Sequence, residues 1–146
     1  ASPCRLLLCA GFVGDVRAEN VNTSVLRKFV DIGLVPVLNA INHDGNGQLF
    51  NTNADTVACS VASAMGAGLV CCFELDGVLA DRDKPDSVIP SIGKAEFEKM
   101  KAEGTIADGM IPKIKNCIDA VRNGAAGAII KNADRIADDS GTKITL

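Results

Sequence analysis

Short apolar runs alternate along this chain with segments whose apolar residues recur at helical spacing. Residues 34–40, 69–73 and 126–130 have the length and composition of buried strands. Residues 54–65 and 110–121 instead have the spacing of helices that bury one face. Alternating helices and buried strands predict an α/β layered fold with a mostly parallel sheet.

Local signals place the ends of further elements. Asn22 or Thr23 can cap a helix that stops at Gly33. Pro36 falls inside the apolar run 34–40, and because proline cannot donate to a strand ladder, it argues against a fully paired central position for this run. Two more elements are expected, a helix over 94–101 and a last strand over 143–146.

Length and composition favour a single globular domain that binds a small molecule. The chain has 146 residues, 47% of them hydrophobic, which is enough for one hydrophobic core. Its net charge of −3 comes from interspersed acids and bases, and it has no Tyr or Trp to stack on bases, so nucleic-acid binding is disfavoured. Since no apolar run reaches the roughly 18 residues that cross a bilayer, we expect no membrane contact and a cytoplasmic location.

The cysteine and histidine content argues against a metal site. None of the six cysteines forms a Cys-x-x-Cys pair and most lie in apolar stretches, so we expect reduced and mostly buried thiols. The one histidine, His43, lies in a glycine-containing turn and is interpreted as a turn residue.

Two polar segments lie where an apolar pattern turns into a helix, at 51–55 and at 108–113. The first N–H groups of a helix have no partner within the helix, and the helix dipole favours negative charge at this end. An anion can therefore be held there, and a lysine in the first turn, such as Lys113, adds a full positive charge. These two segments make phosphoryl transfer the leading functional hypothesis.

Each residue of these segments also has a plain structural interpretation. Thr52 and Asp55 have the spacing of a capping box, in which Asp55 would only support its own helix. Lys113 could be an ordinary solvated helix lysine, and Asn51 could be an amide that satisfies a turn.

The order and spacing of several motifs resemble the amino acid kinase family over nearly the whole chain, and within it the Bacteroidetes-type acetylglutamate kinase branch. The Asn-x-Asn-Ala-Asp and Gly-Met-Ile-x-Lys motifs are specific in combination. The segments that carry the resemblance are 11–16, 33–37, 44–48, 51–56, 77–79, 104–106, 108–113 and 141–142. The resemblance implies a three-layer α/β/α sandwich of the carbamate kinase type.

The resemblance also implies roles for individual residues. The position of Asn51 binds the acylated glutamate, that of Asp55 orients two catalytic lysines, and that of Lys113 is one of these lysines. The reaction would transfer a phosphoryl group from ATP to the side-chain carboxylate of N-acetyl- or N-succinyl-L-glutamate, in arginine biosynthesis. A carboxylate needs no general base, so lysines, helix N-termini and phosphate-bound Mg²⁺ suffice.

Nucleotide contacts are implied for two further segments. Gly77 would allow a close approach of the backbone, and Leu79 and Met110 could cover the adenine. Glu74 and Asp76 depart from the family pattern and leave the details of nucleotide binding open. The complete set of expected nucleotide-binding residues is Glu74, Leu75, Asp76, Gly77, Val78, Leu79, Thr105, Ile106, Ala107, Gly109 and Met110.

The family's N-terminal features have no counterpart in this sequence: a lysine after the first strand, a glycine-rich phosphate loop and an arginine that holds the substrate. Residues 1–146 are therefore interpreted as the C-terminal, nucleotide-binding lobe alone. Three hypotheses follow. The chain could be half of an active kinase, which would be a homo-oligomer when complete, or a nucleotide-binding module without catalysis. It could also be a structural fragment that pairs with another subunit through an exposed apolar sheet edge.

Overall fold

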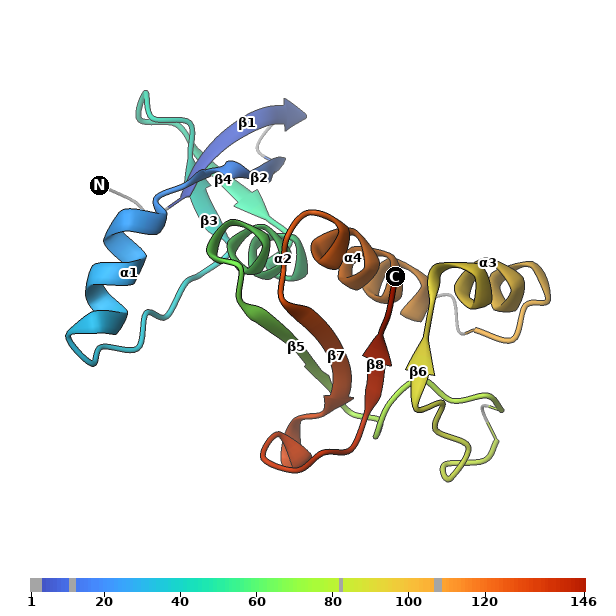
Figure 1. Ribbon diagram of the computed structural model, residues 1–146. Helices are drawn as coiled ribbons and strands as arrows, with labels where there is room; N and C mark the ends of the chain where they lie inside the picture. Colours follow the sequence, from blue (N-terminus) through green and yellow to red (C-terminus); the bar gives the residue numbers. More distant parts are fainter. Residues whose placement is uncertain (1–3, 11–12, 82, 107–108) are drawn as a thin grey trace.

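A computed structural model of the chain describes residues 4–10, 13–81, 83–106 and 109–146, with side chains from residue 13 onward (Figure 1). Four strands close a small barrel at one end of the molecule. Within it, β1 pairs with β2 and β3 with β4 in antiparallel fashion, whereas the β1–β3 and β2–β4 pairs are parallel. The strands are β1 (Cys4–Ala10), β2 (Val13–Val21), β3 (Ile41–His43) and β4 (Leu49–Thr52).

A second sheet has the strand order β5-β7-β8-β6. The β5–β7 and β6–β8 pairs are parallel, as predicted, and β7–β8 is antiparallel. Its strands are β5 (Gly68–Phe73), β6 (Ser91–Ile92), β7 (Gly127–Asn132) and β8 (Thr142–Ile144), and a short 3-10 helix, η1 (Ala133–Arg135), follows β7. The α/β class is confirmed, with the strands of the described residues divided between two sheets.

Helices α2 (Ala54–Met65) and α4 (Met110–Arg122) lie side by side and hold the two sheets together. Helix α2 contacts β2 of the barrel and β5 of the second sheet, and α4 packs on β5, β7 and β8. Small side chains allow the close approach: Ser60 donates to the Val16 carbonyl at 2.6 Å, and Ser63 donates to the Ala120 carbonyl at 3.1 Å. The helices predicted at 54–65 and 110–121 are thus confirmed.

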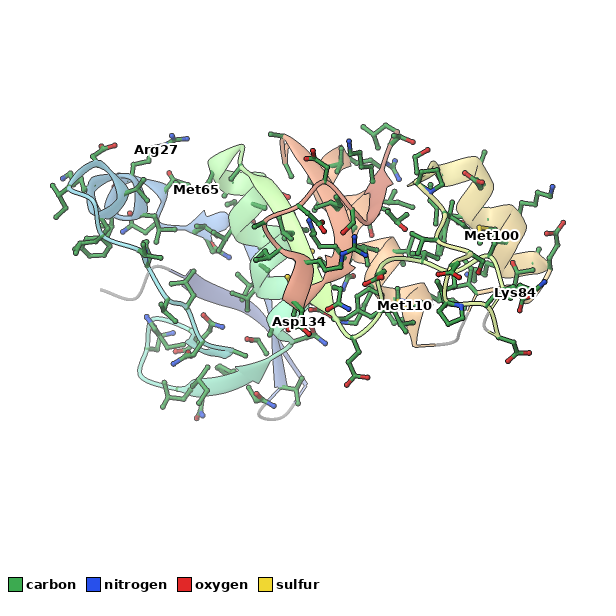
Figure 2. All side chains as sticks on the ribbon, turned by 90° about the horizontal axis from the view of Figure 1, so that it is seen from below. Arg27, Met65, Lys84, Met100, Met110 and Asp134 are labelled. Atoms are coloured by element: carbon green, nitrogen blue, oxygen red, sulfur yellow. The ribbon has the colours of Figure 1, made fainter. Side chains whose placement is uncertain are left out.

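Helix α1 (Thr23–Asp31) begins as predicted, because the Asn22 side chain accepts the N–H of Val25. Arg27 donates to the carbonyl of Met65, at the C-terminus of α2, where the helix dipole favours a cation (Figure 2). Helix α3 (Lys94–Ala102) was also predicted and packs against α4.

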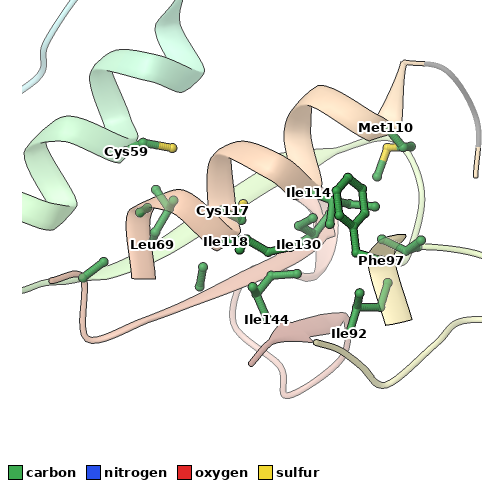
Figure 3. Packing of buried hydrophobic residues seen from close by; sticks show 14 of the residues in the cluster. Cys59, Leu69, Ile92, Phe97, Met110, Ile114, Cys117, Ile118, Ile130 and Ile144 are labelled. Atoms are coloured by element: carbon green, nitrogen blue, oxygen red, sulfur yellow. The ribbon is translucent and has the colours of Figure 1, made fainter. Parts of the chain in front are cut away.

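The main core lies between α4, the second sheet and α3 (Figure 3). Ile114 and Cys117 of α4 and Ile130 of β7 have no exposed surface. A smaller cluster of Val16, Val21, Leu26, Phe50 and Val57 joins the barrel to α1 and α2. Helix α2 contributes side chains to both cores and therefore lies at the centre of the molecule.

The prediction of a strand at 34–40 is wrong. These residues form no strand, and the side chains of Val35 and Val37 are 86% and 92% exposed. Pro36 lacks the N–H that a ladder requires, and β5 has no described partner strand on its outer side. Strand β5 is also not buried on both faces as predicted, since Leu69 is buried while Val70 is 46% exposed.

Among the described residues, no helix combines the length and hydropathy that a bilayer span requires.

Candidate active site

An ion pair joins the first turns of the two central helices. Lys113 Nζ of α4 donates to Asp55 Oδ2 of α2 at 2.9 Å, although the residues are 58 positions apart in sequence. The side chains are 31% and 38% exposed, so a ligand can reach both of them. The structure thus brings together the two residues that the sequence analysis proposed as catalytic.

The plain structural interpretations of these two residues are wrong. The cap of α2 is Asn53, whose side chain accepts the N–H groups of Asp55 and Thr56. Thr52 instead donates its hydroxyl to the Ala40 carbonyl at 2.6 Å, so no capping box forms between Thr52 and Asp55. The Asp55 carboxylate remains available to Lys113, which is therefore not a merely solvated lysine.

Lys113 brings a full positive charge to the site, where it is paired with the Asp55 carboxylate. The hydrogen bond from the Lys113 ammonium to Asp55 raises the pKa of Lys113, so the ammonium is charged at neutral pH. Both helix N-termini point toward this pair, which adds the positive ends of two helix dipoles. Gly109 immediately precedes α4, and no described side chain caps this helix N-terminus. The first N–H groups of α4 can therefore donate to a ligand.

Asn51 lies on β4, in register with Val13 of β2 and Ile41 of β3, and is exposed. It precedes the N-terminus of α2 by three positions, on the barrel side of the Asp55 and Lys113 pair. Its predicted role in binding an acylated glutamate stays a prediction.

A cavity of about 330 Å³ lies next to the N-terminus of α4. Its lining is apolar apart from backbone groups and one threonine, which suits a flat heterocycle such as adenine. Every lining residue is one of the expected nucleotide-binding residues: Leu75, Gly77, Val78, Leu79, Thr105, Ile106 and Met110.

Three of the other expected nucleotide-binding residues, Glu74, Asp76 and Gly109, lie near this cavity. Glu74 and Asp76 line an adjoining hollow of about 180 Å³ that shares Leu75 and Leu79 with it. Gly109 is exposed and immediately precedes α4. Ala107, together with Asp108 of the second motif, lies outside the described residues.

Thr142 of β8 holds the backbone of Val78, one of the residues that line the cavity, a role that the sequence analysis missed. Its buried hydroxyl accepts the N–H of Val78 at 2.8 Å and donates to the Ile89 carbonyl at 2.7 Å. Gly77 packs so closely that an added Cβ would lie 2.7 Å from this hydroxyl and 2.6 Å from Val88 Cγ1. The only sequence signal for this contact was the Gly-Thr pair at 141–142, which carried no assigned role.

Asn132, the last residue of β7, and Arg135 of η1 bind the acidic segment that lines the adjoining hollow. Asn132 donates to Asp76 Oδ1 at 3.0 Å and to the Glu74 carbonyl at 3.2 Å. Arg135 donates to Asp76 Oδ2 at 3.0 Å and neutralises it. Asp138, which also pairs with Arg135, has its pKa lowered chiefly by hydrogen bonds from Ser140. Of the two acidic departures from the family pattern, Asp76 is therefore balanced by a nearby arginine.

Comparison with known proteins decides the family. The sequence model described as "Amino acid kinase family" matches residues 3–132. The chain belongs to the amino acid kinase family. An acetylglutamate kinase from Bacteroides thetaiotaomicron is 47% identical over 138 residues, which cover 92% of this chain and 53% of that protein. A chloroplastic acetylglutamate kinase from Arabidopsis thaliana is 41% identical over 126 residues, covering 86% of this chain and 36% of that protein.

Solved structures agree with this amino acid kinase assignment at the level of the fold. The smu.665 protein from Streptococcus mutans superposes with a TM-score of 0.79 at 28% identity, covering 97% of this chain and 56% of that one. A Giardia carbamate kinase superposes with a TM-score of 0.69 at 16% identity, covering 98% of this chain and 61% of that one. The chain spans about half the length of the curated relatives it matches.

Replacing Gly77 by alanine is expected to weaken Mg-ATP binding to this amino acid kinase chain about tenfold, because the new methyl group forces Val88 or the 75–79 loop to move. Isothermal titration calorimetry measures the change. Gly127→Ala is the matched control, since nothing lies within 4 Å of its added Cβ. Equal affinities of the two variants would contradict the assignment of the cavity.

Proposed function

We propose that this chain is the nucleotide-binding and phosphoryl-transfer half of an acetylglutamate kinase. The complete enzyme would transfer the γ-phosphoryl group of ATP to the side-chain carboxylate of N-acetyl- or N-succinyl-L-glutamate, in arginine biosynthesis. One observation carries the proposal: Met110 lines the apolar cavity, and Lys113, one helical turn further along α4, forms the ion pair with Asp55. A base in the cavity would leave its phosphates near the charged turn.

The residues of the pair fit the electrostatic demands of this reaction. The acceptor carboxylate is already a nucleophile, so the site must chiefly reduce repulsion between two anions and stabilise the charge of the transition state. Lys113 supplies a fixed positive charge, and Asp55 holds its ammonium group in place. Because Asp55 and Asp76 are both engaged by cationic side chains, Mg²⁺ would be held mainly by the ATP phosphates, whose charge it neutralises.

The remainder of the substrate site would come from the half of the relatives' length that residues 1–146 do not match. An exposed apolar segment supports this division, because a set of large side chains at the end of α1 and beyond it is left uncovered: Phe29, Val30, Ile32, Leu34, Val35 and Val37. We propose that this segment packs against that other half. For the complete protein we further propose a homo-oligomer, as the family resemblance implies, and a cytoplasmic location.

Calorimetric titration of the chain with Mg-ATP tests the nucleotide site. Binding is expected at the cavity, and Met110→Ala should weaken it, whereas Met65→Ala, on α2 away from the cavity, should not. Absence of binding would overturn the nucleotide assignment.

A coupled phosphoryl-transfer assay on the complete protein tests the reaction and compares N-acetyl- with N-succinyl-glutamate. Turnover with either acceptor supports a kinase. ATP binding without turnover in the complete protein would support the alternative, a nucleotide-binding subunit without catalysis.

A further inference from the structure

Two thiols from different elements are in contact in the core. Cys71 Sγ of β5 and Cys117 Sγ of α4 lie 3.3 Å apart. Cys117 has no exposed surface, whereas Cys71 is half-buried, so Cys71 is the more accessible residue of the pair. Both cysteines are in the free thiol form in the structure.

The thiol pair lies directly next to the candidate active site. Cys117 follows Lys113 by four positions on α4, so the two side chains share a helix face one turn apart. Figure 3 shows Cys117 on the core-facing side of α4, with Cys59 on the neighbouring helix α2. A covalent change at Cys117 therefore acts on the helical turn adjacent to Lys113.

We propose that Cys71 and Cys117 are a redox modification site, at which a low-molecular-weight disulfide oxidises the two thiols to an intramolecular disulfide between β5 and α4. A disulfide has an S–S length of about 2.05 Å, so the sulfur atoms need to approach by little more than 1 Å. Side-chain rotation and a small shift of one helical turn toward the strand can provide this approach.

The chemistry is ordinary thiol–disulfide exchange, here with glutathione disulfide as the oxidant. The Cys71 thiolate attacks one sulfur of the oxidant, forms a mixed disulfide and releases one glutathione thiolate. The pKa of free Cys117 is raised by its hydrogen bond with Cys71 and by burial, and the mixed disulfide at Cys71 removes the first of these effects. Cys117 then gives its proton to a glutathione thiolate, attacks Cys71 Sγ and releases the second glutathione. Two electrons pass from the protein thiols to the oxidant, which leaves as two molecules of reduced glutathione.

The surroundings assign the first attack to Cys71. The hydrogen bond from Cys117 lowers the pKa of Cys71 against the opposing effects of burial and of the Asp55 charge, and the charge of Lys113 acts in the same direction as the hydrogen bond. Burial instead raises the pKa of Cys59 to about 12, so this thiol does not compete with Cys71 for the first attack on the oxidant. Cys72 is exposed, but successive residues of a strand point to opposite faces, so it points away from Cys117.

The test uses the 146-residue chain in a glutathione redox buffer, followed by thiol alkylation, tryptic digestion and mass spectrometry. Trypsin releases residues 29–82 and 116–122 as separate peptides, so a Cys71–Cys117 bond appears as a cross-link between them. We expect this cross-link in the unchanged chain and in the matched control Cys72→Ser, and roughly tenfold less of it in Cys71→Ser.

A second variant gives a result that does not depend on losing the cross-link. In Cys117→Ala the resolving thiol is missing, so glutathione should remain attached to the 29–82 peptide, and should be lost from it when Cys71 is also replaced. Persistence of the cross-link in Cys71→Ser, or oxidation of the unchanged chain at Cys72 alone, would overturn the proposal. None of these readouts requires kinase activity, so they are separate from the test of the proposed function.

Discussion

Replacing Lys113 by alanine in the complete enzyme is expected to lower turnover by roughly 10²- to 10³-fold, the usual effect of removing one preorganised charge or donor from a transition state. The fold should survive, because partly exposed ion pairs such as Lys113 with Asp55 contribute about 0–1 kcal/mol to stability. The Michaelis constant for ATP should change much less than turnover, since the charge acts mainly on the transferring phosphoryl group. Steady-state kinetics and circular dichroism measure the two effects.

Lys115→Ala is the matched control for Lys113→Ala. Lys115 lies on the same helix and also forms an ion pair, but its partner is Asp119, at 2.7 Å, rather than Asp55, and its side chain is more exposed than that of Lys113. Its replacement should leave turnover within about twofold, because it removes only a surface pair. Equal losses in the two variants, or full activity of Lys113→Ala, would rule out the catalytic assignment of Lys113.

Replacing Gly141 by alanine is expected to lower the free energy of unfolding by about 3 kcal/mol or more. Gly141 has a φ of +114°, a conformation that side-chain-bearing residues rarely adopt. Its added Cβ would also lie 2.7 Å from the Ile130 carbonyl oxygen and 2.8 Å from Lys131 Cβ, on a strand in the middle of the core. Backbone atoms of a paired strand cannot move away cheaply. Urea unfolding of the chain measures the loss.

Gly47→Ala separates the two causes of the Gly141 effect. Gly47 has a similar φ of +100°, but nothing lies within 4 Å of its added Cβ. The Gly47→Ala substitution should therefore lower the free energy of unfolding only by the backbone strain, about 1–2 kcal/mol. If both variants were destabilised equally, the close contact at Gly141 would contribute nothing and the packing of β7 against the 141–142 turn would have to be reconsidered.

The helices were predictable because their signals are local. Asn22 caps α1, and the apolar spacing of 54–65 and 110–121 marked the faces that α2 and α4 bury. The residues that line the cavity beside α4 were predictable as a group for a different reason: they come from segment 75–79, from Thr105 and Ile106, and from Met110, which a family resemblance could identify by motif. Neither inference required knowledge of which elements are neighbours in space.

Local signals failed where pairing partners matter. The run 34–40 is as apolar as a buried strand, yet it is exposed, because a strand needs a neighbour and Pro36 removes one of the groups that would bind it. Thr52 and Asp55 have the spacing of a capping box, yet Thr52 bonds to Ala40 and Asn53 takes over the cap. In both places the local sequence allows more than one backbone structure, and contacts with residues distant in sequence determine which one forms.

By itself, the sequence determined the α/β class, the helices and the identity of the residues that carry charge at two helix N-termini, since these depend on periodicity and on residue type. Only the tertiary structure decided that Asp55 meets Lys113, that Thr142 holds Val78, that Arg135 neutralises Asp76 and that Cys71 contacts Cys117. The partners in each of these contacts are 46 to 64 positions apart. Such contacts arise from the packing of α2 and α4 with the second sheet, which no local pattern of residues specifies.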